Sequence, residues 1–303
     1  MTILVLMATY NGMAHLPEQV QSIQTQQGVD VQILAYDDQS TDATPEWLDE
    51  HGIQRLPTRP ERLGPAGAFV HLLLTADLGQ SEAIALSDQD DLWSPDKLQQ
   101  QLKTLRGDAL LAGVSSNVTA FWQDGRRQLI NKAGRPTTHD HLLESAGPGC
   151  TYLLSRAFVD ALRVAWTQHG LTSIEAHVRG RPHHDWLLYA SARALGWRWV
   201  MIPQPLTLYR QHAQNVFGVN RGWRGKWLRL KALMNRDFQE RQFELVTLVA
   251  QWGHDSKAEE WLQIAHTSGM RARFHRAFWL FRGRRHAHEG LALAIAALVG
   301  LWS

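Results

Sequence analysis

The sequence predicts an α/β protein, Rossmann-like, with a mostly parallel central sheet flanked by helices. Two observations predict this class: apolar runs of strand length alternate with segments of helical spacing, and the first three runs each end in a polar loop. These runs are residues 3–8, 31–36 and 82–86. Ligands of an open parallel sheet bind beyond the carboxyl ends of its strands, so the three loops are expected to line one crevice.

The helices of the first half begin with recognisable signals. Leu16, Val20 and Ile23 have helical spacing, Thr44-Pro45 places a proline in a first helical turn, and residues 64–74 form a third helix. The second half predicts strands near residues 111–117, 151–154 and 197–202, helices near 156–168 and 186–195, a loop at Tyr209-Arg210-Gln211-His212, and a wholly helical pattern after Gly222.

Composition bounds the class of protein. The 303 residues, 44% of them hydrophobic, can bury a large core or a catalytic domain with an appendage. The single cysteine, Cys150, excludes an intramolecular disulfide framework and favours a cytoplasmic location, where we expect it to be a small buried residue. The N-terminus lacks the basic flank of a signal peptide, and the longest apolar run, 291–302, is too short to span a bilayer.

Charge is distributed unevenly along the chain. Residues 1–218 carry 17 Lys+Arg and 22 Asp+Glu, whereas residues 219–303 carry 14 and 7. An acidic catalytic part followed by a segment attracted to anionic surfaces would have this distribution.

The strongest chemical signal is the loop that contains Asp88, Asp90 and Asp91, three carboxylates in four positions after an apolar strand. Carboxylates this close repel one another, and their oxygens are suited to Mg²⁺ or Mn²⁺, which can bridge them to a diphosphate. The alternative is a solvated acidic turn that caps the helix begun by Ser94-Pro95.

A second acidic loop contains Asp37 and Asp38, followed by Gln39-Ser40-Thr41-Asp42. A carboxylate there could accept hydrogen bonds from a nucleobase imide or from ribose hydroxyls. The alternative is a structural turn, since Asp and Ser are common in turns. The position after the second strand, with Thr9-Tyr10-Asn11 after the first, favours a nucleoside pocket.

Five elements in this order resemble the family 2 glycosyltransferases, which have the A-type nucleotide-sugar transferase fold. Residues 8–12 resemble the opening loop of the family, residues 37–42 its base-binding loop, and Asp88-Gln89-Asp90 its metal-binding DxD element. Gly147-Pro148-Gly149-Cys150-Thr151 resembles its acceptor-side strand, and His183-His184-Asp185-Trp186 lies where the family has its base. Residues 87–93 with 209–212 are most similar to the bacterial rhamnosyltransferase branch.

The resemblance implies the activity, the domains and the site. It implies an inverting transferase that moves a sugar, L-rhamnose from dTDP-L-rhamnose or a sugar from another nucleotide donor, to a glycan or lipid-linked acceptor in surface polysaccharide synthesis. The catalytic domain would span residues 1–218, with a nucleotide-sugar-binding half at about 1–95 and an acceptor half at 96–218, before a basic, Trp-rich extension at 219–303. Donor-binding residues would be Thr9, Tyr10, Asn11, Asp37, Asp38, Asp88, Gln89 and Arg210, and metal ligands Asp90, Asp88, Asp91 and His212.

Asp185 is the expected base. It would deprotonate the acceptor hydroxyl, and one direct displacement would invert the anomeric centre. The sequence here has His-Asp where many relatives have Glu-Asp, which leaves the role of His184 open and keeps Asp185. The alternative is that Asp185 only caps a helix.

The tail predicts basic amphipathic helices. Phe274, Phe278 and Phe281 repeat among Arg271, Arg273, Arg276, Arg282, Arg284 and Arg285, and Trp223, Trp227, Leu230 and Met234 form a similar face. Such helices can bind anionic lipid on the inner face of a membrane. The alternative is that the aromatic residues pack on the catalytic domain or on a second subunit.

Two other functions fit part of the sequence. A nucleotidyltransferase would need a glycine- and arginine-rich phosphate loop after the first strand, and residues 9–15 do not provide one. A nucleic-acid-binding module could use the basic tail, but the acidic loops oppose it. We therefore expect no nucleic-acid partner.

Overall fold

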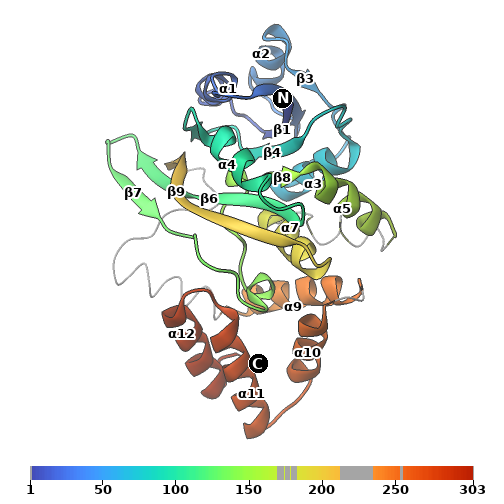
Figure 1. The fold of residues 1–303 in the computed structure, drawn as a ribbon, viewed down its shortest axis with the longest axis vertical. Helices are drawn as coiled ribbons and strands as arrows, with labels where there is room; N and C mark the ends of the chain where they lie inside the picture. The colour runs from blue at the N-terminus through green and yellow to red at the C-terminus, as the bar shows by residue number, and fades with distance from the viewer. Residues whose placement is uncertain are drawn as a thin grey trace. The chain divides into compact units, whose positions relative to one another are not determined.

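The computed structural model describes residues 2–168, 174, 178, 183–211, 235–252 and 255–302 (Figure 1). The chain forms two compact units. The first comprises Met1–Ala133, Ala146–Asp185 and Trp197–Val216, and the second comprises Gly134–Ser145, Trp186–Gly196 and Phe217–Ser303.

The first unit is built on one sheet, with strand order β3-β2-β1-β4-β8-β6-β9-β5 and β7 paired to β6. Strands β1, β2, β3 and β4 are parallel, as are β6 and β9, while β8 joins β4 to β6 by antiparallel pairing. The strands are β1 Thr2–Thr9, β2 Asp30–Asp37, β3 Gln54–Arg55, β4 Ala83–Ser87, β5 Leu92–Trp93, β6 Leu111–Trp122, β7 Arg127–Ile130, β8 Leu153–Ser155 and β9 Arg198–Gln211.

Helices flank this sheet, as the sequence predicts: α1 Leu16–Gln24, α2 Thr44–Glu50, α3 Gly64–Thr75, α4 Lys97–Leu105 and α5 Arg156–Gln168. Residues Ile3, Val5 and Met7 of β1 are fully buried in a cluster that includes Leu16 and Ile23 of α1. The polar loops after β1, β2 and β4 therefore begin at the end of a rigid, apolar support. The α/β class is confirmed.

The end of β9 differs from the prediction. The strand runs through Tyr209 and Arg210 to Gln211, where a loop was expected. Pro203 and Pro205 lie within this strand, although proline cannot donate to a ladder. The register between β6 and β9 shifts around Asn117, and these irregularities accommodate the prolines so that pairing continues. The segment 149–151 also differs, because it forms a 3₁₀ turn before β8 rather than a strand.

The helical extension is confirmed over the described part of the second unit. Its helices are α9 Arg236–Ala250, α10 Ser256–Ala265, α11 Met270–Gly283 and α12 Ala287–Leu298, and α7 His184–Ala194 begins at the last residues of the first unit. Asn235 and Asp255 cap α9 and α10 with their side chains. Within the described ranges, no helix has the length and apolarity needed to cross a bilayer. Trp223, Trp227, Leu230 and Met234 lie outside the described residues.

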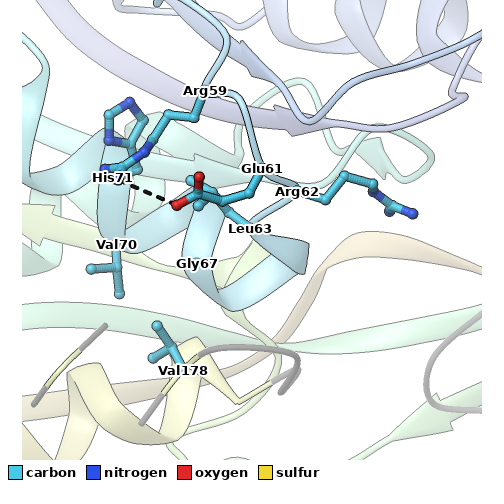
Figure 2. A pocket seen from close by; sticks show the side chains of 8 residues that line it. All are labelled: Arg59, Glu61, Arg62, Leu63, Gly67, Val70, His71 and Val178. Atoms are coloured by element: carbon cyan, nitrogen blue, oxygen red, sulfur yellow. Dashed lines mark ion pairs between the residues drawn. The ribbon is translucent and has the colours of Figure 1, made fainter. Parts of the chain in front are cut away.

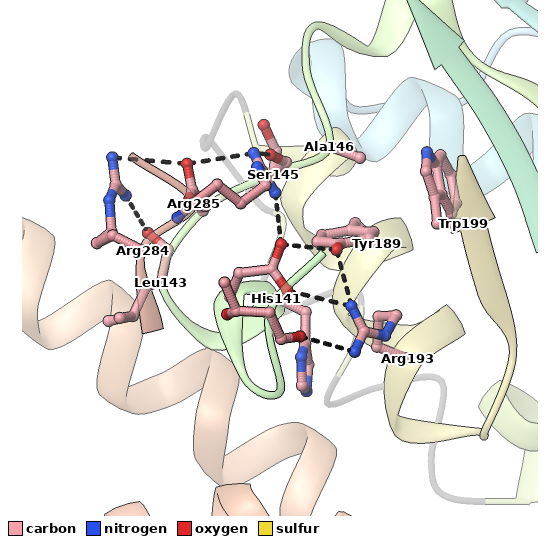
Figure 3. Close-up of polar contacts among 12 residues, drawn as sticks. His141, Leu143, Ser145, Ala146, Tyr189, Arg193, Trp199, Arg284 and Arg285 are labelled. Carbon is pink, nitrogen blue, oxygen red and sulfur yellow. Dashed lines mark hydrogen bonds and ion pairs between the residues drawn. The ribbon is translucent and has the colours of Figure 1, made fainter. Parts of the chain in front are cut away.

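Three of the arginines predicted to belong to basic amphipathic helices are instead buried in the second unit. Arg285 donates to Asp140 at 2.7 Å, and Arg284 donates to the carbonyl of Leu143 at 2.8 Å (Figure 3). Arg284 also pairs with Glu289. Arg276 donates to the carbonyl of Thr267 at 2.5 Å. A buried guanidinium needs such partners, and the partners of Arg284 and Arg285 on residues 140–145 are remote in sequence.

Candidate functional site

The loops after β1 and β2 are joined by hydrogen bonds. The backbone N–H groups of Asn11 and Gly12 donate to Ser40 Oγ and Thr44 Oγ1 at 2.8 and 2.9 Å, and Asn11 Oδ1 accepts from the N–H of Thr41 at 2.7 Å. Asn11 has a φ of 46° and Gln39 a φ of 67°, a region that residues other than glycine seldom adopt. Strain of this kind persists where the surroundings hold it, and it is concentrated at binding sites.

The carboxylates of the second acidic loop face inward. Asp37 accepts hydrogen bonds from Thr9 Oγ1 at 2.9 Å and from the Ser40 N–H at 2.9 Å. Asp38 is 3% exposed and accepts from the N–H groups of Leu63 and Gly64, at 2.7 and 2.8 Å. Asp38 therefore holds the first turn of α3, and the nucleoside contacts expected of both carboxylates stay predictions.

Gln89 connects the loop after β4 to the loop after β1. Its side-chain amide accepts from the Tyr10 N–H at 2.8 Å and donates to the Tyr10 carbonyl at 2.9 Å. A Cβ at Gly12 would lie 2.2 Å from Gln89 Oε1, so position 12 requires glycine while this bridge is present. The three predicted loops are thus brought together as the sequence suggests.

Carboxylates from distant parts of the chain interact at this place. Burial, followed by the charges of Asp90 and Asp185, raises the pKa of Asp88 to about 7. Asp185 lies in the first turn of α7, whereas Asp88 and Asp90 follow β4, so the fold brings the predicted base to the acidic loop. Mutual repulsion of this kind is relieved by a cation or by a proton.

Asp91 lies deeper than its neighbours in the loop and is fully buried. Its Oδ1 accepts from the Arg210 N–H at 3.1 Å, and its Oδ2 has no hydrogen-bond partner in the described part of the chain. One ligand atom each of Asp88, Asp91 and Cys150 lies within 4.8 Å of the others. Burial raises the pKa of the Cys150 thiol well above its usual value, so this sulfur stays protonated and is a poor ligand for a hard cation.

Lys97 is a residue that sequence analysis missed. It is fully buried, and its Nζ lies 3.7 Å from the centroid of the Trp93 ring. Burial lowers the pKa of Lys97 to about 7, while nearby Cys150 and Asp91 act in the opposite direction. The helical spacing of Lys97 with Gln101 and Leu105 was the available signal, because both of those side chains are buried on α4.

Arg210 holds the acidic loop from β9. Its Nε donates to the carbonyl of Asp90 at 2.8 Å, and its guanidinium pairs with Glu18 at 2.5 Å. These contacts fix the main chain of the loop, and contact with a donor stays a prediction. His212 lies outside the described residues.

The region before Asp185 is closely packed. His184 is 6% exposed, stacks on Phe69 with ring centroids 4.1 Å apart, and lies so near Gly149 that a Cβ there would be 2.1 Å from its Nε2. The Tyr152 hydroxyl donates to the carbonyl of Asp185 at 3.2 Å. This packing fixes the main chain that carries the Asp185 carboxylate, and it gives His184, whose role the sequence left open, a packing role.

A pocket is lined by the loop before α3, by α3 itself and by Val178 (Figure 2). Arg59 and Glu61 in its wall form an ion pair at 3.6 Å. Arg62 lies over the Tyr10 ring, with its guanidinium carbon 3.4 Å from the centroid, and its Nε is 3.7 Å from Asp38. Sequence analysis did not single out these arginines, although two cations between a short strand and Gly64-Pro65 were a signal for an anion-binding segment.

Comparisons with known proteins agree with this geometry. Residues 4–156 match the model of glycosyl transferase family 2. The chain is 32% identical over 250 residues to the dTDP-rhamnosyl transferase RfbG of Shigella flexneri, which covers 80% of this chain and 84% of that protein. An uncharacterised protein of Mycobacterium tuberculosis is 27% identical over 194 residues, 62% of this chain and 52% of its own length.

A solved structure of S. aureus TarS, residues 1–349 in complex with UDP, has a TM-score of 0.52 to this chain at 13% identity. The match covers 99% of this chain and 90% of the other, and at this identity it shows the fold alone. With the family model and RfbG, it confirms the resemblance stated from the motifs. The chain belongs to glycosyltransferase family 2.

Proposed function

We propose that the chain is an inverting, metal-assisted transferase of L-rhamnose from dTDP-L-rhamnose to a hydroxyl of a glycan or lipid-linked acceptor, in bacterial surface polysaccharide synthesis. The observation that supports this chemistry best is the electrostatic repulsion between Asp185 and Asp88, which come from distant parts of the chain. The donor is supported by the similarity to a dTDP-rhamnosyl transferase over most of both chains.

In the proposed reaction, Asp185 accepts the proton of the acceptor hydroxyl as the acceptor oxygen attacks the anomeric carbon. The bond from that carbon to the diphosphate oxygen breaks, and its electron pair leaves with the diphosphate. Attack from the face opposite the leaving group inverts the centre. The packed main chain around His184 limits the movement of this base, and a positioned base contributes about 10²–10⁴-fold.

A divalent cation fits the acidic loop. Carboxylate oxygens are ligands suited to Mg²⁺ or Mn²⁺, and the unpartnered Oδ2 of Asp91 and the repulsion acting on Asp88 would both be relieved by a cation. Asp90 and Asp88 would hold the ion, with Asp91 behind them and His212 as a further ligand. When bound, the ion supplies positive charge at the leaving diphosphate.

The donor would bind against the loops after β1 and β2. Tyr10 under the Arg62 guanidinium offers a flat, cationic surface for a base or a phosphate, and Asn11 lies in the same cross-linked loop. Thr9, Asp37, Asp38 and Gln89 fix the shape of this surface through the hydrogen bonds described above. A cytoplasmic location is part of the proposal and is supported by the single, buried cysteine.

A donor screen tests the proposal. Calorimetric titration and donor hydrolysis with dTDP-L-rhamnose, UDP-glucose and GDP-mannose, each with Mg²⁺ or Mn²⁺ and then with EDTA, compare the bases and sugars directly. We expect binding and slow metal-dependent hydrolysis of dTDP-L-rhamnose. Preference for another nucleotide sugar would leave the proposed transferase activity intact but contradict rhamnose as the sugar. Donor binding that EDTA does not affect would contradict the proposed role of the metal.

A further inference from the structure

Two stripes of large apolar side chains are exposed on α11 and α12. Phe274, Phe278 and Phe281 on α11 are 58%, 62% and 43% exposed, and their spacing places them on one side of the helix. On α12 and at its C-terminal end, Leu291, Ile295 and Val299 are 54%, 52% and 61% exposed with the same kind of spacing. Isolated exposed hydrophobic residues are ordinary, but contiguous patches mark interaction sites.

The two stripes lie on helices that pack against each other. Helices α11 and α12 lie side by side within the second unit (Figure 1), and a Cβ at Gly290 would be 2.5 Å from the carbonyl oxygen of Phe281, so their backbones touch. Trp279 and Leu280 of α11 and Leu293 of α12 are buried. On each helix the exposed side chains therefore lie on the side away from that helix's own buried residues, and we term these six side chains the α11–α12 apolar face.

The surroundings of this face are positively charged. Arg271, Arg273 and Arg282 are exposed on α11, and the Arg282 guanidinium carbon lies 5.4 Å from the centroid of the Phe278 ring. Glu289 is the one acidic residue of the sequence from 270 to 303, and it pairs with buried Arg284. The charge at the apolar face is therefore carried by arginines.

We propose that the α11–α12 apolar face docks on the surface of a bilayer that contains anionic lipid. Phenylalanine and aliphatic side chains would enter the boundary between headgroups and acyl chains, while the three arginines contact lipid phosphates. A symmetric dimer through the same face would bring these arginines against their own copies, which disfavours a second copy as the occupant. The inference uses neither the donor nor the metal.

Vesicle sedimentation of the full chain, without donor, tests the contribution of the exposed apolar side chains to membrane binding. Phe274→Ser with Phe278→Ser is compared with the matched pair Leu129→Ser and Val164→Ser, which removes two exposed apolar side chains of the first unit. We expect the parental chain and the control to bind vesicles containing phosphatidylglycerol. The phenylalanine variant should bind at least about tenfold more weakly, since each exposed phenylalanine loses its burial in lipid.

A second double variant, Arg271→Glu with Arg282→Glu, tests the contribution of the positive charge. Its control is Lys103→Glu with Arg127→Glu, which reverses two exposed cations of the first unit. Only the α11 double variant should weaken binding by about tenfold or more, and binding should fall at high salt and on pure phosphatidylcholine. Circular dichroism identifies variants that fail to fold. Equal binding by the variants and controls, or no binding by the parental chain, would overturn the proposal. So would a dimer, detected by light scattering, that only Phe274→Ser with Phe278→Ser dissociates.

Discussion

Replacing His184 by Leu should reduce the sensitivity of folding to acid. The His184 imidazole is buried against Phe69 and Gly149, and neither ring nitrogen has a hydrogen-bond partner among the described residues. Burial, with a smaller effect of the His183 charge, lowers the pKa of His184 to about 3. Leucine does not titrate and is small enough to avoid Gly149.

The sign and size of the effect follow from proton linkage. A histidine in the unfolded chain has a pKa of about 6.5, so below that pH the unfolded state binds a proton that folded His184 excludes. The contribution to stability is therefore present above about pH 6.5 and is lost as the pH falls toward the folded value. The slope is about 1.4 kcal/mol per pH unit, which gives about 2 kcal/mol at pH 5.

Urea unfolding of the parental chain and of His184→Leu from pH 8 to pH 5 measures this difference. The free energies of unfolding should differ by a constant amount above pH 7.5, and the parental value should then fall by about 2 kcal/mol more than the variant value by pH 5. His51→Leu, at an exposed histidine, is the control and should follow the parental curve. Parallel curves for His184→Leu would refute the neutral, buried state.

Three further substitutions test the loops. Asp90→Ala should abolish metal-dependent transfer and leave the circular dichroism spectrum unchanged, and transfer at the parental rate with chelator present would contradict this. Asp38→Ala should weaken dTDP binding in a calorimetric titration by about tenfold, since two backbone N–H groups lose their acceptor; unchanged affinity would restrict Asp38 to a structural turn. Gly12→Ala should displace the Gln89 side chain and raise KM for the donor, and adding Gln89→Ala to this variant should raise KM little further. If the two substitutions raise KM additively, the hydrogen-bonded bridge between these loops is contradicted.

The first half of the fold could be predicted because its signals are local. Residues 3–8, 31–36 and 83–86 lie in β1, β2 and β4, whose apolar runs end where the polar loops begin, and parallel pairing then brings these loops to one edge of the sheet. The convergence of Asp88 and Asp90 with Tyr10 follows from this arrangement.

The remainder depended on long-range contacts. Prolines 203 and 205 indicate the end of a strand when read locally, and only the pairing of β9 with β6 shows that bulges accommodate them. Arg285 lies in the same basic, aromatic-rich segment as exposed Arg282, but its side chain is buried because it pairs with Asp140. Asp140 lies 145 residues earlier in the chain. Arg62 acquires significance only when the fold places it over Tyr10. No periodic pattern in the sequence predicts these long-range contacts.

The central claim is that Asp185 acts as the base opposite the acidic loop, and Asp185→Asn tests it most directly. Asparagine keeps the shape of this side chain in the first turn of α7, so the fold and dTDP binding should stay close to parental. Because the variant cannot accept the proton, single-turnover transfer from dTDP-L-rhamnose to acceptor should fall by about 10²–10⁴-fold. Near-parental transfer with parental nucleotide affinity would contradict the account.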